Sequence, residues 1–268
     1  MFDKIDNGKW WDKGLQLVEG CTKVSEGCEN CWSLSMERRF GKPARVIFHH
    51  TRLNVPGKRK KPTVYAIWND LFHSAITDEQ IDLVMQMIKE CPWHLFLVLT
   101  KRPGRALEYF RARNIKGWNR QHNLWIGVTV ENQNMAMLRI PLLLQMPSDK
   151  IFVSVEPMLE KISLTSLPEL HIAGRIRKNV LRGVQWYEDM DDSRSDTPCR
   201  RIDWVIVGAE TGHRHRPMNE DWVISLYFEC RSNNIPFFYK QAFRGEKKIT
   251  APPLPFEGGK QYIEIPEI

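Results

Sequence analysis

Three cysteines within eleven residues have the types and spacing of a metal-binding loop. Cys21, Cys28 and Cys31 follow the pattern C-x6-C-x2-C. Thiolates are soft ligands suited to zinc and to iron–sulfur clusters. A [4Fe–4S] cluster held by three cysteines keeps one iron open to a substrate or cofactor. A structural zinc site takes four protein ligands, so zinc would need His49 or His50 as its fourth.

Other interpretations of the triplet stay open at this point. Two of the three cysteines can form a structural pair, with the third incidental. Gly20 and Gly27 favour a tight loop around a metal, because glycine lets the backbone turn where side chains would clash. Outside the triplet, Cys91 and Cys230 come late in expected helices, where we interpret them as small hydrophobic residues.

Length and composition predict a globular protein that does not enter a membrane. The chain has 268 residues, 42% of them hydrophobic, which suffices for a sizeable core, and we expect one domain over 1–268. No apolar run approaches the roughly 18–20 residues that span a bilayer. The N-terminal residues 1–6 lack the apolar core of a secretory signal. We therefore expect a cytoplasmic protein whose thiols stay reduced and available as ligands.

The charge balance favours a polyanionic partner. The formal net charge is +7, and such a balance supports binding to nucleic acid or nucleotides. Solvated surface lysines and arginines, which many enzymes carry for solubility, are the alternative. The basic residues concentrate in Lys58–Lys61 and at Arg175, Arg177, Lys178, Arg182, Arg200 and Arg201.

Short apolar runs alternate with helical patterns along the chain, which is typical of parallel β/α units. Together with a possible strand near Leu15–Val18, they predict six to eight parallel strands in a complete or partial TIM-like (β/α) barrel. The six runs are Val64–Trp68, Leu95–Leu99, Leu124–Val130, Ile151–Val155, Trp204–Val207 and Phe237–Tyr239.

Polar side chains follow these runs, at the end of a barrel where active sites are built. One charged residue after a strand is usually the edge of a loop, but the repetition after six strands favours a site. Three of the residues are glutamates, which leaves open acid–base catalysis around a non-redox metal. The set is Asn69, Asp70, Lys101, Arg102, Glu131, Asn132, Glu156, Glu210, Lys240 and Gln241.

Two segments break the β/α rhythm. The segment 159–201 is long, basic at first and acidic at Glu188–Asp192. We expect an insertion at the active-site rim, either a lid or substrate-reading loop or a tolerated surface excursion. The tail from Ala251 is rich in proline and glycine, and we expect it to pack along the outside of the domain.

Seven segments between about Trp10 and Gln241 resemble, in order, the motifs of the phage-associated three-Cys-motif family. This family of unknown function is common in bacteriophages and mobile elements and is considered radical-SAM-like. Collinear motifs over nearly the whole chain are more specific than the cysteine triplet alone. The segments are Gly20–Trp32, Asn69–His73, Leu99–Pro103, Gly127–Asn132, Val153–Leu159, Asp203–Gly212 and Pro236–Gln241.

The resemblance implies a radical S-adenosylmethionine enzyme on a TIM-like barrel. The three cysteines would hold a [4Fe–4S] cluster, whose open iron binds S-adenosylmethionine. An electron donor such as flavodoxin or ferredoxin would supply the electron that releases a 5′-deoxyadenosyl radical. Lys101 and Lys240 become the candidate catalytic residues. The candidate cofactor-binding residues are Trp32, Asn69, Asp70, Glu131, Asn132, Glu156 and Glu210.

The phage setting implies a nucleobase or nucleotide substrate, modified or rearranged to protect phage DNA. The x6 gap departs from the common radical-SAM spacing C-x3-C-x2-C and predicts a longer cluster loop. The alternative is a zinc-stabilised nucleic-acid-binding or accessory protein without radical chemistry. The sequence does not decide the oligomeric state.

Overall fold

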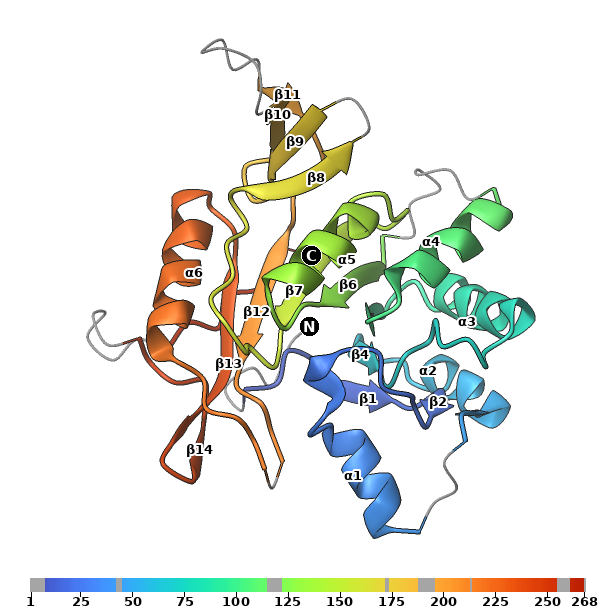
Figure 1. Ribbon diagram of the computed structural model, residues 1–268. Coiled ribbons are helices and arrows are strands. Elements are labelled where there is room, and N and C mark those ends of the chain that lie inside the picture. Colours follow the sequence, from blue (N-terminus) through green and yellow to red (C-terminus); the bar gives the residue numbers. More distant parts are fainter. Residues whose placement is uncertain are drawn as a thin grey trace.

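Seven parallel strands and one antiparallel strand form the main sheet of the computed structural model (Figure 1). The structure describes residues 8–41, 45–114, 122–171, 174–187, 196–212, 214–254 and 261–267. The sheet curls into a half-barrel with the strand order β1-β4-β5-β6-β7-β12-β13-β14. Its strands are β1 (Lys13–Leu15), β4 (Val64–Ile67), β5 (Leu95–Thr100), β6 (Leu124–Thr129), β7 (Lys150–Val155), β12 (Trp204–Gly208), β13 (Phe237–Arg244) and β14 (Lys247–Thr250).

Four helices cover the convex face of this sheet. They are α3 (Asp78–Glu90), α4 (Pro103–Ala112), α5 (Gln133–Leu143) and α6 (Glu220–Ser232). Among the described residues, no helix is both long enough and apolar enough to cross a membrane. The shorter elements near the cysteines and before β4 are β2 (Val18–Glu19), the 3-10 helix Glu26–Cys28, α1 (Trp32–Arg39), β3 (Ile47–Phe48), the 3-10 helix His50–Leu53 and α2 (Asn54–Gly57).

Two apolar clusters fill the two faces of the sheet. Alternate residues such as Phe96 and Val98 on β5 pack against the helices in the larger cluster. The intervening residues Leu95 and Leu97 point to the concave face. A smaller cluster there centres on aromatic side chains, and it closes the amino-terminal part of the half-barrel. Its aromatic members are Trp10, Trp125, Phe152, Trp204 and Phe238.

The prediction of parallel β/α units is confirmed in its coarse form, as a mixed α/β fold with a partial barrel. All six predicted runs are strands, and they pair in parallel in chain order. The strand expected near Leu15–Val18 divides into β1, which joins the main sheet, and β2, which pairs with β3. Thr77 and Gln80 form the capping box of α3.

The insertion differs from the expectation of a lid at the active-site rim. Its described part forms a small antiparallel sheet of β8 (Leu167–His171), β9 (Gly174–Asn179), β10 (Val184–Tyr187) and β11 (Thr197–Pro198). Arg200 donates to the carbonyls of Met146 and Ser148, which precede β7. The small sheet therefore lies toward the amino-terminal ends of the main strands, opposite the cysteine loop (Figure 1). The acidic run Glu188–Asp192 lies outside the described residues.

The segment that leads to this sheet takes the place of a crossover helix between β7 and β12. It runs in extended form between α5 and α6 (Figure 1). Gln133 of α5 bonds the backbone of Ser163, and Glu229 of α6 accepts from the Leu164 N–H at 2.8 Å. Backbone groups that a helix would have satisfied internally are bound here by side chains of the flanking helices.

The tail contributes to the sheet. The Tyr239 N–H donates to the Tyr262 carbonyl at 2.7 Å, and the Glu264 N–H donates to the Phe237 carbonyl at 3.1 Å. Trp204 donates its indole N–H to the Glu264 carbonyl at 2.9 Å. The described end of the tail thus covers the edge of β13 beside β14, which leaves less of that edge open to other chains.

Candidate functional site

The cysteine loop, residues 20–31, lies across the carboxyl-terminal ends of the main strands. Gly20 has φ +85°, and a Cβ there would lie 2.4 Å from the Arg45 carbonyl oxygen. A Cβ at Gly27 would lie 2.2 Å from Cγ of Glu131. Both positions therefore exclude a side chain, the first where the loop starts and the second where it meets the residues after β6. This supports the expectation of a tightly turned loop.

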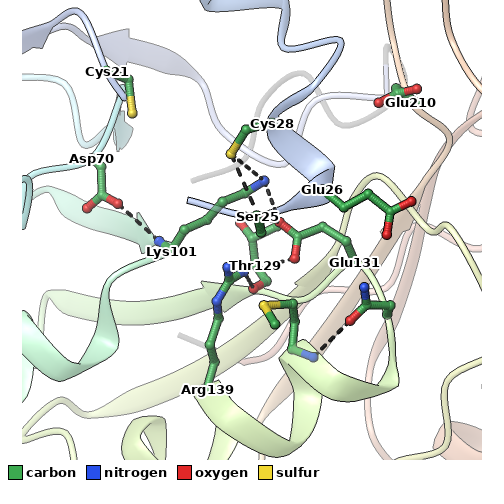
Figure 2. Close-up of polar contacts among 12 residues, drawn as sticks. Cys21, Ser25, Glu26, Cys28, Asp70, Lys101, Thr129, Glu131, Arg139 and Glu210 are labelled. Carbon is green, nitrogen blue, oxygen red and sulfur yellow. Dashed lines mark hydrogen bonds and ion pairs between the residues drawn. The ribbon is translucent and has the colours of Figure 1, made fainter. Parts of the chain in front are cut away.

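Lys101 connects the cysteine loop to the strand ends. Its Nζ lies 3.6 Å from Cys28 Sγ and 2.5 Å from Glu131 Oε1. Figure 2 shows Lys101 reaching from the Asp70 side of the site toward Cys28 and Glu131. Ser25 Oγ donates to the same Glu131 oxygen at 2.7 Å. The carboxylate of Glu131 is 0% exposed and also accepts from Arg139 Nη1 at 2.9 Å, so two cations balance its charge.

Arg102 likewise connects the first cysteine, Cys21, to the strand ends. Its Nη1 lies 3.8 Å from Cys21 Sγ and donates to Asp70 Oδ2 at 2.8 Å, while its Nη2 donates to Thr22 Oγ1 and O. The His73 Nδ1 accepts from the Ala75 N–H at 3.0 Å, so its Nε2 carries the proton donated to Thr22 Oγ1 at 2.9 Å. Two adjacent cations after β5 thus reach two different cysteine sulfurs.

Asn69 holds the two ends of the loop together. Its Nδ2 donates to the Val18 carbonyl before the loop, and its Oδ1 accepts from Ser33 Oγ after it, both at 3.0 Å. Asn69 itself has φ +61°, a conformation that asparagine tolerates better than most residues. The amide therefore fixes the spacing between β2 and the start of α1.

Arg216 and Glu210 clamp the far side of the loop. Glu210 accepts from Asn30 Nδ2 at 3.0 Å and from Arg216 Nη2 at 2.6 Å. Arg216 Nη1 also lies 3.1 Å from Glu26 Oε1 and 3.3 Å from Glu29 Oε2. One guanidinium thus binds three carboxylates and joins the loop to the residues after β12.

The remaining predicted site residues do not contact the cysteine loop in the same way. Glu156 and Lys240 pair with each other, with Nζ 2.6 Å from Oε1. Asn132 Oδ1 accepts from the Met135 N–H at 2.9 Å and so caps α5. Trp32 is 48% exposed, and its ring stands T-shaped to that of Trp68, with the ring centroids 5.7 Å apart.

The electrostatics distinguish the two cation-bound thiols. Burial acts to raise the pKa of the Cys28 thiol, but the Lys101 ammonium and hydrogen bonds from the backbone at Val24 and Ser25 lower it below its usual value. Burial raises the pKa of the Cys21 thiol, and Arg102 offsets only part of this effect. Burial likewise opposes ionisation of Glu131, yet Lys101 and Arg139 lower its pKa, so it stays a carboxylate.

The donor chemistry fits an anionic metal–sulfur centre. Three thiols lie on one loop, and cations approach two of the sulfurs, which offsets the negative charge of thiolates. Among the described residues, no three His, Cys, Asp or Glu side chains are gathered in metal-binding positions. The two histidines considered as the fourth ligand of a zinc site contact other residues: His49 Nε2 lies 2.8 Å from Glu19 Oε2, and the His50 ring packs on Phe48.

Several residues of this site were not found from the sequence. Arg139 had a detectable signal, because it shares a helical stripe with the buried Ala136, Ile140 and Leu143. An arginine in such a stripe indicates a buried partner. Ser25 and His73 carried no comparable signal, since their partners Glu131 and Thr22 lie far away in sequence. Arg216 carried none either, although its partner Glu210 is near in sequence.

Fold and site together define a half-barrel α/β protein whose cysteine loop crosses the strand ends and is bound there by lysine and arginine side chains. The chain belongs to DUF5131, a family described as protein of unknown function, whose model matches residues 6–252. No curated protein and no solved structure matches it. The resemblance is therefore confirmed only as membership of an uncharacterised family, and its phage association and radical-SAM chemistry stay predictions.

Proposed function

We propose that the protein is a radical S-adenosylmethionine enzyme that modifies or rearranges a nucleobase. The observation that carries the proposal is the cysteine loop at the carboxyl edge of a half-barrel, with Lys101 and Arg102 directed at two of its sulfurs. Cys21, Cys28 and Cys31 would hold the [4Fe–4S] cluster. When S-adenosylmethionine is bound, such a cluster supplies the electron that yields a 5′-deoxyadenosyl radical for hydrogen abstraction.

The surrounding residues have defined tasks in this proposal. Asn69 fixes the two ends of the loop. Arg102 binds the loop at Thr22, and Arg216 binds it at Glu26. Lys101 neutralises charge at Cys28, and the buried Glu131 keeps that lysine in place. The carboxylates Glu131 and Glu210 already have cationic partners, so they position the loop. Direct contact with S-adenosylmethionine would require one of those ion pairs to open.

Reconstitution with iron and sulfide under anaerobic conditions tests the proposal on the full chain. We expect about four irons per chain, a brown protein and, with a reductant and S-adenosylmethionine, formation of 5′-deoxyadenosine. Alanine at Cys21, Cys28 or Cys31 should abolish iron binding, because three-point attachment leaves no spare ligand.

The matched control is Cys199→Ala, which removes a half-buried thiol outside the loop. We expect it to keep the full iron content. Full iron content in Cys28→Ala would contradict the ligand assignment. A colourless protein that binds one zinc per chain and forms no 5′-deoxyadenosine would favour the zinc-stabilised accessory protein instead.

A further inference from the structure

A β-bulge in β13 brings a lysine and a glutamine to the same carboxylate. The pairing of β12 with β13 is regular through Val207 and Tyr239, but Gly208 then faces Gln241, so Lys240 is the extra residue. Lys240 Nζ lies 2.6 and 2.8 Å from the two oxygens of Glu156, and Gln241 Nε2 donates to Oε1 at 2.9 Å. Bulges of this kind commonly redirect side chains beside active sites.

Strand β12 leaves room for the array that Glu156, Lys240 and Gln241 form. Glu156 follows β7 and Lys240 lies on β13, with β12 between them. A Cβ at Gly208 of β12 would already touch Cγ of both Glu156 and Gln241 at 3.4 Å. Any larger side chain would fill the space in which these residues meet.

The array faces the concave interior of the half-barrel, where two of its three side chains keep partial access to solvent. Lys240 and Glu156 are 17% and 19% exposed, although they are flanked by sheet strands. Ser154, two residues before Glu156, is 1% exposed, and its hydroxyl has no hydrogen-bond partner within the described structure. Its strand neighbours Val153 and Val155 pack toward the helices, so alternation turns Ser154 to the concave side.

An aromatic ring borders the array. The half-buried Trp11 lies with its ring centroid 5.5 Å from Lys240 Nζ, a cation–π distance. Its ring also stands T-shaped to Trp10, with the centroids 4.8 Å apart, and it packs against the aromatic cluster on the concave face. Trp11 therefore offers a flat apolar surface next to a donor and an acceptor.

We propose that Glu156, Lys240, Gln241 and Trp11 form the substrate-recognition subsite, and that it takes an uncharged planar heterocycle, a free nucleobase or nucleoside. Glu156 would accept from ring or exocyclic N–H groups, Lys240 would donate to ring nitrogens or carbonyls, and Trp11 would stack. Gln241 is 1% exposed and donates to Glu156 and to the Ala209 carbonyl, so it would hold Glu156 in place. This assignment rests on the proposed radical function and specifies its substrate. It gives Lys240 a recognition role beside its expected catalytic one.

Charge and position favour the free, uncharged form. A phosphate at Lys240 would meet the Glu156 carboxylate, which lies within 3 Å of the same Nζ. Lys248 of β14 supplies a competing positive charge near the array, although partial burial and the Lys240 ammonium lower its pKa, an effect that Glu156 opposes. The basic run Lys58–Lys61 precedes β4 and so lies at the opposite end of the strands.

Calorimetric titration of the full chain tests the subsite. The probes are adenosine, guanosine, cytidine and thymidine, their 5′-monophosphates and a short single-stranded DNA. We expect one-to-one binding of at least one nucleoside, weakened about tenfold or more in Lys240→Met and in Glu156→Gln. Trp11→Leu should also weaken it, whereas Trp11→Phe should retain most of it. Lys247→Met, on the same hairpin, should change affinity less than about twofold.

Three outcomes would overturn the proposal: no nucleoside binds, binding is unchanged in both Lys240→Met and Glu156→Gln, or a monophosphate or the DNA binds more tightly than any nucleoside. A gain from phosphate that is lost in Lys248→Met would assign the site to nucleotides. The titrations are made with and without the reconstituted cluster. Nucleoside binding to iron-free protein therefore tests the subsite even if iron binding fails, and 5′-deoxyadenosine formation without nucleoside binding would remove only the subsite.

Discussion

At the scale of single residues, the site is organised by cations placed against sulfur. Lys101 and Arg102 are consecutive, yet their side chains diverge to Cys28 and Cys21. Each forms an ion pair with a carboxylate, Lys101 with Glu131 and Arg102 with Asp70. Positive charge beside a metal–sulfur centre stabilises its reduced, more negative state, so these residues should raise the reduction potential of the proposed cluster.

We expect Lys101→Met to lower the midpoint potential of the reconstituted protein by an amount on the order of 100 mV, as expected for one charge removed at a few ångströms in a partly buried site. Potentiometric titration followed by electron paramagnetic resonance measures it. Lys101→Arg keeps the charge and should lie close to wild type. An unchanged potential in Lys101→Met would show that the lysine does not act on the centre electrostatically.

The sequence predicted which residues meet at the strand ends, but not how they pair. Asn69, Asp70, Lys101, Glu131 and Glu210 were found because each follows an apolar run of a parallel sheet. Their partners could not be assigned, since a pairing such as Glu131 with Ser25 depends on how two loops cross in space. Asn132 also follows a strand, yet it caps the next helix, a use that the same pattern predicts equally well.

At the scale of secondary-structure elements, strands with a clear local sequence pattern were predicted, whereas elements that depend on tertiary contacts were not. The strands with both faces covered were predicted to within about two residues, because their apolar runs are continuous. β13 continues to Arg244, beyond the predicted Tyr239, since its polar end pairs with β14. The sheet β8–β11 was not predicted either, because its residues do not alternate cleanly and its position depends on contacts with Met146 and Ser148.

The extended connection between β7 and β12 leads to a prediction of pH-dependent stability. Burial raises the pKa of Glu229 on α6, although the Leu164 N–H stabilises its ionised form. The Glu229 side chain therefore contributes fully to the stability of the fold below the ordinary glutamate pKa of about 4.3. This contribution is lost as the pH rises through the raised pKa of Glu229 in the folded protein. Glu229→Gln keeps an oxygen acceptor without the charge, so its melting temperature should exceed that of wild type at neutral pH by roughly 1–3 °C.

Thermal melts across a pH series measure this difference, which should shrink toward zero as the pH falls below the ordinary glutamate value. Glu108→Gln, at an exposed position of α4, is the control and should follow wild type throughout. A Glu229→Gln variant that is less stable than wild type at neutral pH, with the difference vanishing at low pH, would contradict the prediction. It would show that the hydrogen bond from Leu164 to the ionised carboxylate outweighs the cost of burying its charge.

At the scale of the whole molecule, the two ends of the half-barrel differ in their chemistry. The carboxyl end carries the cysteine loop and mixes acidic with basic groups, among them Glu131, Arg216 and Lys101. The amino end carries Lys58–Lys61 and the small sheet with Arg177, Lys178 and Arg182, while the Arg175 side chain lies outside the described residues. The basic segments in which the sequence concentrates positive charge therefore lie away from the proposed site.

This separation predicts that DNA affinity and substrate chemistry can be changed independently. Lys58, Lys60 and Lys61 are exposed, whereas Arg59 donates to Thr63 Oγ1 and is best left in place. Replacing the three lysines by glutamine should leave nucleoside binding and 5′-deoxyadenosine formation unchanged. If the amino end binds duplex DNA, each lost phosphate contact removes about 0.9 from the slope of log affinity against log salt, so the slope should fall by up to about 2.7.

Fluorescence anisotropy across a salt series, with the wild type and the triple variant, measures that slope. A solvated basic surface predicts weak binding that the substitutions barely change. Loss of nucleoside binding or of 5′-deoxyadenosine formation in a folded triple variant would contradict the separation, because Lys58–Lys61 and the cysteine loop lie at opposite ends of β4. The substrate would then have to reach both ends of the sheet, as a polymer can and a free nucleoside cannot.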